Sequence, residues 1–495
     1  MKRWLLACAA LLGTPTLAQD DLLCLKDGRV FADLSMERTD GGVTIHFENG
    51  DVAVPGGLIL DALVAGSSSF EPTNDEEREK LAKGFVPFDG KWVSQKRRDQ
   101  LIAKRLKERR EAIEEMQAHR EWRNRYREES KNFAFEFTVP KHIFDGYRES
   151  MEAYFSIFAK DWKVKRPRDR PKLSVCFYGS RKEFHRTGGA GSYVLGYFKF
   201  HPEFDLNIYY DRLDPAETED VMFHEANHYL QKLIDVDFSY PHWPGEALAE
   251  YYGASAWDPD SGKLTTGLIQ EGRLIEIQND IAGGKMLGLA ELILDERAYE
   301  HYTWGWSLVH FLMNDKRHAK KFQKFFVALA KGKDVRREDR GMGLKTVRGP
   351  EVWRAFRDYL GLRDDEDVVE LQQKWHAYVQ DKLELTSARG LEKAALSALR
   401  TGRDLRAQRL FEEAIAAGSS SALTYHKYAG LLRNKGKREA AVANWRRAIE
   451  LDPLAGSYYY ALGRALASKD KDESARLKAL GLEIDPEAAS EWWWD

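Results

Sequence analysis

After its first twenty residues, the chain opens on short runs in which β-branched and aromatic residues alternate with polar ones. Asp27-Gly28 and Asn49-Gly50 stand between these runs. Asp-Gly and Asn-Gly steps are typical of the tight turns of β-hairpins, because their residues tolerate positive φ angles. The pattern predicts a small β-rich module over residues 19–70.

The next segment is dense in charge. Within residues 96–131, Ile102, Leu106 and Ile113 recur near helical spacing, which predicts one long helix with a thin apolar stripe. The basic residues leave a nucleic-acid-binding helix as an alternative interpretation. The interleaved acids favour a solvated helix. We therefore predict a linker and charged helix over residues 71–131 and no nucleic-acid partner.

Helix and strand patterns then alternate over residues 132–380, which predicts a mixed α+β domain. The predicted elements are strands at 133–139 and 172–178, an amphipathic helix at 147–158, and a hairpin formed by 193–200 and 204–210 that turns at His201-Pro202.

The C-terminal segment repeats itself every 34 residues. Small and aromatic positions keep this period, so that Gly402, Ala407, Phe411 and Ala414 recur as Gly436, Ala441, Trp445 and Ala448. This pattern resembles tetratricopeptide repeats, and it predicts an α-solenoid over residues 388–490 whose concave face binds a protein partner. The alternative is a stack that only packs against the preceding domain.

Composition narrows the class of protein. The chain has 495 residues, of which 43% are hydrophobic, and this excludes a disordered or collagen-like protein. Its 76 Lys and Arg nearly balance 79 Asp and Glu, so net charge gives no reason to expect nucleic acid. Three cysteines exclude a cysteine-rich zinc module. Cys24 and Cys176 either pair in an oxidising compartment or remain buried thiols.

Residues 1–18 have the layout of a secretory signal peptide. Lys2 and Arg3 precede an apolar run at 4–12, and small residues then suit a cleavage site. This predicts an exported protein, periplasmic or secreted. The apolar run is too short to cross a bilayer and no later run is longer, so no transmembrane segment is expected. A lipoprotein attached through Cys8 is the alternative.

The candidate chemistry lies in His224-Glu225-Ala226-Asn227-His228. An Asp-Pro step ten residues earlier marks the start of a helix, on which two histidines at i and i+4 share one face. Their imidazoles can converge on one Zn²⁺, which lowers the pKa of a bound water to near 7, and Glu225 can accept the proton of that water. The alternative is a surface helix with two ordinary histidines.

A third ligand has to come from elsewhere. The metzincin pattern would need Gly and His at the positions occupied by Gln231 and Ile234, so that class is excluded. A second helix begins near Trp243 and carries Glu246 and Glu250.

This order of motifs resembles the gluzincins, the zinc metallopeptidases related to thermolysin, and in particular exported bacterial zincin-like proteins of unknown function. The resemblance implies that Glu246 is the third zinc ligand and that Glu250 hydrogen-bonds a ligand histidine. Gly245 departs from the Asn that is usual in that family, and the separation of 18 residues between His228 and Glu246 is slightly short. His242 is the competing third ligand.

The resemblance also implies a donor for the oxyanion and a strand that pairs with a peptide. Tyr302 is the candidate donor, with His301 in reserve, on an aromatic helix that could equally be plain core. The strand at 204–210 is the candidate edge strand.

We therefore predict an α+β protein with a zincin-like core, a small N-terminal β module and a C-terminal α-solenoid. Its expected function is zinc-dependent hydrolysis of peptide bonds in peptide or protein substrates. The alternative is a catalytically silent zincin-like scaffold whose repeats mediate protein–protein assembly in the cell envelope.

Overall fold

The computed structural model describes residues 21–32, 34–64, 72–88, 90–167, 171–191, 194–199 and 204–489. The predicted signal peptide and the predicted turn at His201-Pro202 lie outside these ranges. The chain divides into two compact units. Residues up to 115 and from 421 onward form the first unit, and residues 116–420 form the second unit.

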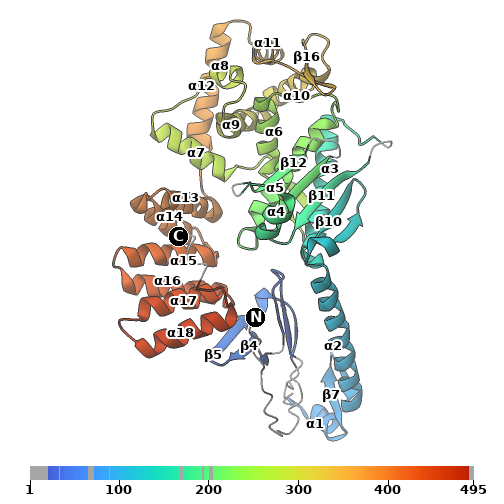
Figure 1. Cartoon of the computed structure of the whole chain (residues 1–495), viewed down its shortest axis with the longest axis vertical. Coiled ribbons are helices and arrows are strands. Elements are labelled where there is room, and N and C mark those ends of the chain that lie inside the picture. Colours follow the sequence, from blue (N-terminus) through green and yellow to red (C-terminus); the bar gives the residue numbers. More distant parts are fainter. Residues whose placement is uncertain are drawn as a thin grey trace, which may run out of the picture. The chain divides into compact units, whose positions relative to one another are not determined.

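The N-terminal part of the first unit contains two small antiparallel sheets (Figure 1). Gly28 has a φ of 87°, in the left-handed region that favours glycine, next to the turn that joins the first two strands. The strands are β1 (Leu22–Leu25), β2 (Val30–Ala32) and β6 (Ile59–Leu63) in one sheet, and β3 (Ser35–Thr39), β4 (Gly42–Phe47) and β5 (Gly50–Pro55) in the other.

A short helix, a hairpin and a long helix follow: α1 (Asp75–Ala82), β7 (Phe85–Phe88), β8 (Lys91–Ser94) and α2 (Gln95–Ala118). The helix α2 has no buried residue, as its charge pattern predicts. It ends at Ala118 rather than near 131, because β9 (Tyr126–Glu129) pairs with the sheet of the second unit. The prediction of a single long helix over 96–131 is therefore wrong for residues 119–131.

The sheet of the second unit has five strands in the order β12-β13-β11-β10-β9. Its strands are β12 (Gly196–Lys199), β13 (Asp205–Tyr209), β11 (Leu173–Tyr178), β10 (Phe133–Phe137) and β9. The strand β13 runs parallel to β11 and antiparallel to β12, so it lies inside the sheet. The prediction that residues 204–210 form the edge strand is wrong, because the hairpin partner β12 occupies that edge.

Helices cover this sheet and build the core of the second unit. The helix α3 (Lys141–Trp162) packs against α5 (Pro215–Lys232), which also contacts β12 and β13. The other elements are α4 (Arg181–Gly188), α6 (His242–Gly253), β14 (Ala256–Asp258), β15 (Lys263–Thr265), α7 (Glu271–Ala282), α8 (Leu289–Leu294), α9 (Glu300–Asn314), α10 (Lys316–Lys331), β16 (Glu338–Gly341), β17 (Leu344–Thr346), α11 (Gly349–Leu360) and α12 (Asp365–Lys382). Aromatic side chains dominate the core, and Trp243, Trp304 and Trp375 are fully buried there.

Three helical pairs form the C-terminal repeats, which confirms the predicted helical repeat region (Figure 1). They are α13 (Ala388–Arg400) with α14 (Asp404–Ala416), α15 (Ala422–Asn434) with α16 (Arg438–Leu451), and α17 (Gly456–Leu466) with α18 (Lys471–Ile484). The first pair belongs to the second unit, where α13 packs against α7. The other two pairs belong to the first unit, so the division between the units falls inside the repeats.

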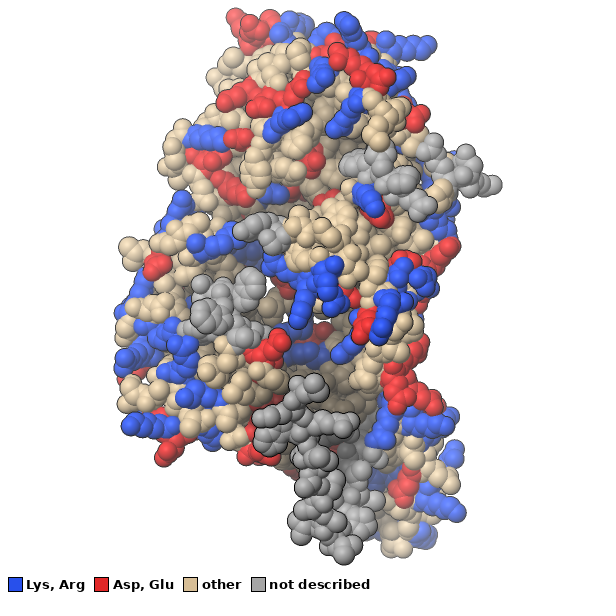
Figure 2. All heavy atoms as spheres, in the orientation of Figure 1, with Lys and Arg blue, Asp and Glu red and all other residues tan. Residues whose placement is uncertain are grey.

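Several smaller predictions concern the chain as a whole. Cys24 and Cys176 are free thiols, so the structure holds them unpaired. Within the described ranges, no helix is both long and apolar enough to cross a membrane. Basic and acidic side chains are interspersed over the face drawn in Figure 2.

Candidate metal centre

The helix α5 carries the two histidines, and its start is defined by side chains. The carboxylate of Asp214 accepts a hydrogen bond from the backbone N–H of Glu217 at 3.1 Å, and Pro215 occupies the first turn. The side chain of Glu217 pairs instead with Lys393 of α13. The side chain of Asp214 therefore caps the helix, and the carboxylate of Glu217 links α5 to the first helical pair.

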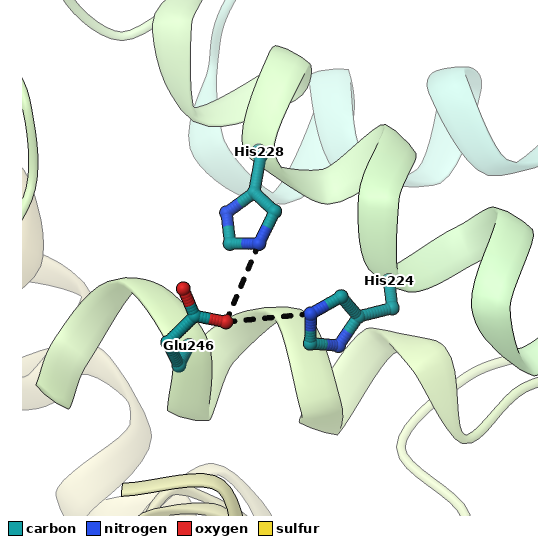
Figure 3. Close-up of side chains that lie close together, drawn as sticks. All are labelled: His224, His228 and Glu246. Atoms are coloured by element: carbon teal, nitrogen blue, oxygen red, sulfur yellow. Dashed lines mark ion pairs between the residues drawn. The ribbon is translucent and has the colours of Figure 1, made fainter. Parts of the chain in front are cut away.

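His224, His228 and Glu246 form the one group of metal-binding type among the described residues, with ligand atoms within 4.8 Å of one another (Figure 3). The Nε2 atoms of both histidines lie 3.4 Å from Oε2 of Glu246. Tetrahedral zinc with bonds of about 2.0–2.1 Å separates its ligand atoms by roughly 3.3 Å. The three side chains therefore fit Zn²⁺, with one direction left for water.

The charges of this group are mutually stabilised. Burial raises the pKa of Glu246, but the imidazoles of His228 and His224 outweigh burial and hold that pKa well below its usual range. Burial lowers the pKa of His224, yet the carboxylates of Glu250 and Glu246 raise it to about 9. Glu246 is therefore an anion at neutral pH, as a carboxylate ligand must be.

Glu246 is placed by contacts between α5 and α6. The amide of Gln231, on α5, donates hydrogen bonds to Asn227 at 2.8 Å and to the carbonyl of Gly245 at 2.9 Å. Asn227 in turn donates to the hydroxyl of Tyr154 at 2.6 Å. This buried chain fixes the start of α6 one residue before the third candidate ligand. In the sequence, Gln231 served only to exclude the metzincin pattern, and no motif indicates this role.

Glu250 lies beside the histidine that it was expected to orient. Its Oε1 atom is 3.5 Å from Nδ1 of His224 and 2.6 Å from the guanidinium of Arg273 on α7. The side chain of Glu250 is 4% exposed, so its charge is compensated locally by Arg273. Sequence reasoning missed Arg273, because no motif or spacing relates a residue on α7 to the histidine helix.

Tyr302 lines the same hollow as Glu225. This hollow, of about 480 Å³, is bordered by the metal-binding group, Arg273 and the edge strand β12. The Tyr302 ring stacks with His224 at a centroid distance of 6.3 Å, and Arg273 lies over its face. Burial and the nearby Glu246 raise the pKa of Tyr302, so its hydroxyl keeps its proton at neutral pH and is available as a donor.

The two competing histidines bind each other instead. The Nδ1 atoms of His242 and His301 are 2.7 Å apart. Nε2 of His301 donates to the carbonyl of Leu292 at 2.9 Å, so Nδ1 of His301 accepts the proton of His242. His301 is fully buried and engaged at both nitrogens, which removes it as the oxyanion donor. His242 does not belong to the metal-binding group.

A second hollow, of about 860 Å³, is also lined by His228 and Glu246. Its walls come from the segment between α5 and α6 and from the hairpin β16–β17. Because both hollows are lined by His228 and Glu246, they adjoin at these two side chains.

Comparisons with known proteins leave the family open. No protein-family model matches the chain, and no curated protein matches it. Two solved structures that resemble part of it are crystal structures of MamA. One is 17% identical and covers 41% of this chain and 99% of its own, and the other is 18% identical and covers 38% and 96%. Both have a TM-score of 0.21, which supports no inference about function.

Proposed function

We propose that this chain is a zinc-dependent peptidase. The observation that carries the proposal is the convergence of His224, His228 and Glu246 in a group that fits zinc, with Glu225 lining the hollow beside it. Three protein ligands with an open position are typical of catalytic rather than structural zinc sites. The gluzincin class, the zinc and the exported location belong to this proposal.

Each side chain around the zinc site has a separate role in the proposed reaction. Zinc, when bound, lowers the pKa of a water molecule and polarises the carbonyl of the substrate. Glu225 accepts a proton from the attacking water and returns it to the leaving amine. Tyr302 donates its hydroxyl hydrogen to the oxygen on which negative charge develops. Glu250, held by Arg273, fixes the orientation of the His224 ring.

The edge strand supports a peptide as the substrate. Gly196, Tyr197 and Phe198 of β12 line the hollow that contains Glu225. One side of β12 pairs with β13, so its other side offers backbone groups to an extended peptide. Because both hollows reach His228 and Glu246, a substrate can extend through both of them. We therefore propose cleavage of internal peptide bonds.

The variant Glu225→Gln tests this proposal. It keeps all three ligands and should bind one zinc per chain, while peptide hydrolysis falls by about three orders of magnitude or more. Glu276→Gln is the control, since Glu276 lies on α7, pairs with Arg273 and lines neither hollow. Retained hydrolysis in Glu225→Gln, with normal zinc content, would contradict the assignment of the base.

A second candidate function is protein assembly through the repeats, with a catalytically silent core. The helical pairs α15–α16 and α17–α18 favour it, because stacked pairs of this kind present a continuous surface to protein partners. Under this candidate, a stable partner would bind the wild type and Glu225→Gln equally, and neither would hydrolyse peptides. Zinc-dependent cleavage by the wild type alone would exclude a purely structural role.

A further inference from the structure

Four cations line the larger hollow beside the metal-binding group, and two of them, Arg297 and Arg340, form no ion pair with a carboxylate among the described residues. Lys232, Arg297, Arg340 and Arg348 contribute positive charges to its wall. The carboxylates in the same wall are Glu246, Glu296 and Asp339. Glu246 belongs to the metal-binding group, so two carboxylates remain for four cations.

Arg348 and Glu296 form an ion pair with each other. Arg348 contacts Glu296 at 3.2 Å and Glu338 at 3.2 Å. Glu296 also accepts the backbone N–H of Gly349 at 3.0 Å. These contacts neutralise Arg348 and hold the segment after β17 in place. They leave Arg297, the chain neighbour of Glu296, without an ion pair to any carboxylate among the described residues.

Arg340 is held at the wall by a neutral partner. Its guanidinium donates to the hydroxyl of Ser239, and no described carboxylate lies within ion-pair distance of it. The backbone of Ser239 is in turn fixed to the hairpin, since its N–H donates to the carbonyl of Lys345 at 2.8 Å. The cation is therefore positioned by the fold beside the hollow.

Arg340 also lies close to another cation. Lys232 is 6% exposed and donates to the carbonyl of Phe238 at 2.8 Å. Burial, and then the charge of Arg340, lower the pKa of Lys232 to about 8. The carboxylates of Asp235 and Asp237 offset part of this effect on Lys232. An anionic occupant of the hollow would be attracted to both cations.

We propose that this hollow binds a carboxylate of the peptide substrate, with Arg297 and Arg340 as the residues that recognise it. Guanidinium groups match carboxylates in a two-point geometry, and carboxylates are the anions that an unmodified peptide carries. The carboxylate comes either from an Asp or Glu side chain or from the C-terminus of the peptide. This inference deepens the proposed peptidase function and rests on it.

Binding to the inactive variant Glu225→Gln tests the inference without hydrolysis. Three kinds of fluorescent ten-residue peptide would be compared by anisotropy. The first kind is neutral with both ends blocked, and the second is a series of end-blocked peptides that each carry one Glu at a different position. The third kind has neutral side chains and a free C-terminal carboxylate. We expect at least one acidic peptide to bind about tenfold more tightly than the neutral peptide. The kind of peptide that binds more tightly identifies the carboxylate that the hollow recognises, either a side chain or the C-terminus.

Substitutions then assign the gain to residues. Arg297→Gln and Arg340→Gln, each added to Glu225→Gln, should each remove a large part of the tenfold difference, and the double variant should remove all of it. Arg317→Gln is the matched control, because Arg317 is 87% exposed, lines neither hollow and carries the same charge. Affinity for the neutral peptide should stay unchanged in all of them. Unchanged melting temperatures would show that the variants are folded.

Three results would overturn the inference: equal binding of all peptides, binding of none, or a gain that survives in the double variant. Failure of the peptidase proposal would be seen separately, as absence of zinc or of hydrolysis in the wild type. Hydrolysis by the wild type with no preference for a carboxylate would reject the inference and leave the peptidase intact.

Discussion

The metal-binding region of the second unit and the repeats α15–α18 of the first unit are stabilised in different ways. Around the metal-binding group, buried polar side chains from α5, α6 and α7 compensate one another, as in the contact of Glu250 with Arg273. In the repeats, small residues let neighbouring helices touch, and aromatic residues such as Trp445 fill the space between them. The first region depends on long-range polar contacts and the second on local apolar packing.

Because the two regions are stabilised differently, substitutions in them should affect different properties of the protein. A defect in the apolar packing of α15–α18 should cost folding free energy and leave the metal-binding group intact. A defect in the polar contacts around His224 should affect metal binding more than stability. The following substitutions separate the two effects, from the largest expected change to the smallest.

The substitution Trp445→Ala should destabilise the repeats most. Trp445 is fully buried, and removal of such a side chain typically costs about 3–5 kcal/mol. Hydrogen exchange of the amides in 421–484 should accelerate accordingly, while zinc content stays at the wild-type level. Leu482→Ala is the control, since Leu482 is 39% exposed and should change stability by less than about 0.5 kcal/mol. Loss of zinc in Trp445→Ala would show that the two regions are not independent.

Acid should destabilise the second unit through His310. Burial lowers the pKa of His310 to about 4, whereas an unfolded histidine titrates near 6.5. The unfolded state therefore binds the proton first as pH falls from about 6.5 to 4, and the unit loses up to about 3 kcal/mol over that range. Unfolding of metal-free protein at both pH values measures this loss.

His310→Gln supplies the comparison for that measurement. The glutamine has no charge to gain, so its stability should fall less between the two pH values than that of the wild type. The imidazole of His310 shares a hydrogen bond of 2.9 Å with Tyr378, which an amide can also make. Parallel losses in the two proteins would contradict the assignment to His310.

Glu250→Gln should weaken metal binding by about 10–100-fold, the usual effect of losing a group that orients a ligand histidine. Its carboxylate lies beside His224 and Arg273, and glutamine keeps the shape but not the charge. Competition with a chelator of known affinity measures the change. Glu276→Gln removes the other carboxylate on Arg273 and should leave zinc affinity unaltered. Equal effects of the two variants would mean that only net charge matters.

The smallest effect is expected for glycines of the repeats. A Cβ atom at Gly463 would lie 2.9 Å from the carbonyl of Ser474, so Gly463→Ala should cost about 1–2 kcal/mol. A Cβ atom at Gly430 meets nothing within 4 Å, and Gly430→Ala should be neutral or slightly stabilising because alanine favours helices. Urea unfolding of both variants gives the comparison. Similar free energies of unfolding for the two variants would show that the close contact between helices does not require glycine at position 463.

The sequence predicts the repeats well because their information is local. A period of 34 residues places small and aromatic residues at the same points of successive helical pairs, and the helices form there. The spacing of His224 and His228 is local in the same sense, since one helix turn brings both rings to one side. Their joint position with Glu246 followed from the order of motifs, and the roles of all three stay predictions.

Strand order and contacts between side chains on different helices could not be predicted from local spacing and periodicity. Hydrophobic alternation marks a strand without giving its neighbours, which is why 204–210 was placed at the edge that β12 occupies. Arg273 and Gln231 act through side chains on other helices, which no spacing rule relates to the histidines. The helix predicted to 131 ended early because strand pairing of β9 outweighed its charge pattern.

Metal analysis of the purified full chain tests the central claim most directly. Mass spectrometry of native protein would compare the wild type with His228→Ala and Glu246→Ala. We expect about one zinc per wild-type chain and loss of that zinc in both variants, because each removes one of the three proposed ligands. A wild type that holds no zinc after reconstitution, or variants that keep it, would contradict the proposed metal centre.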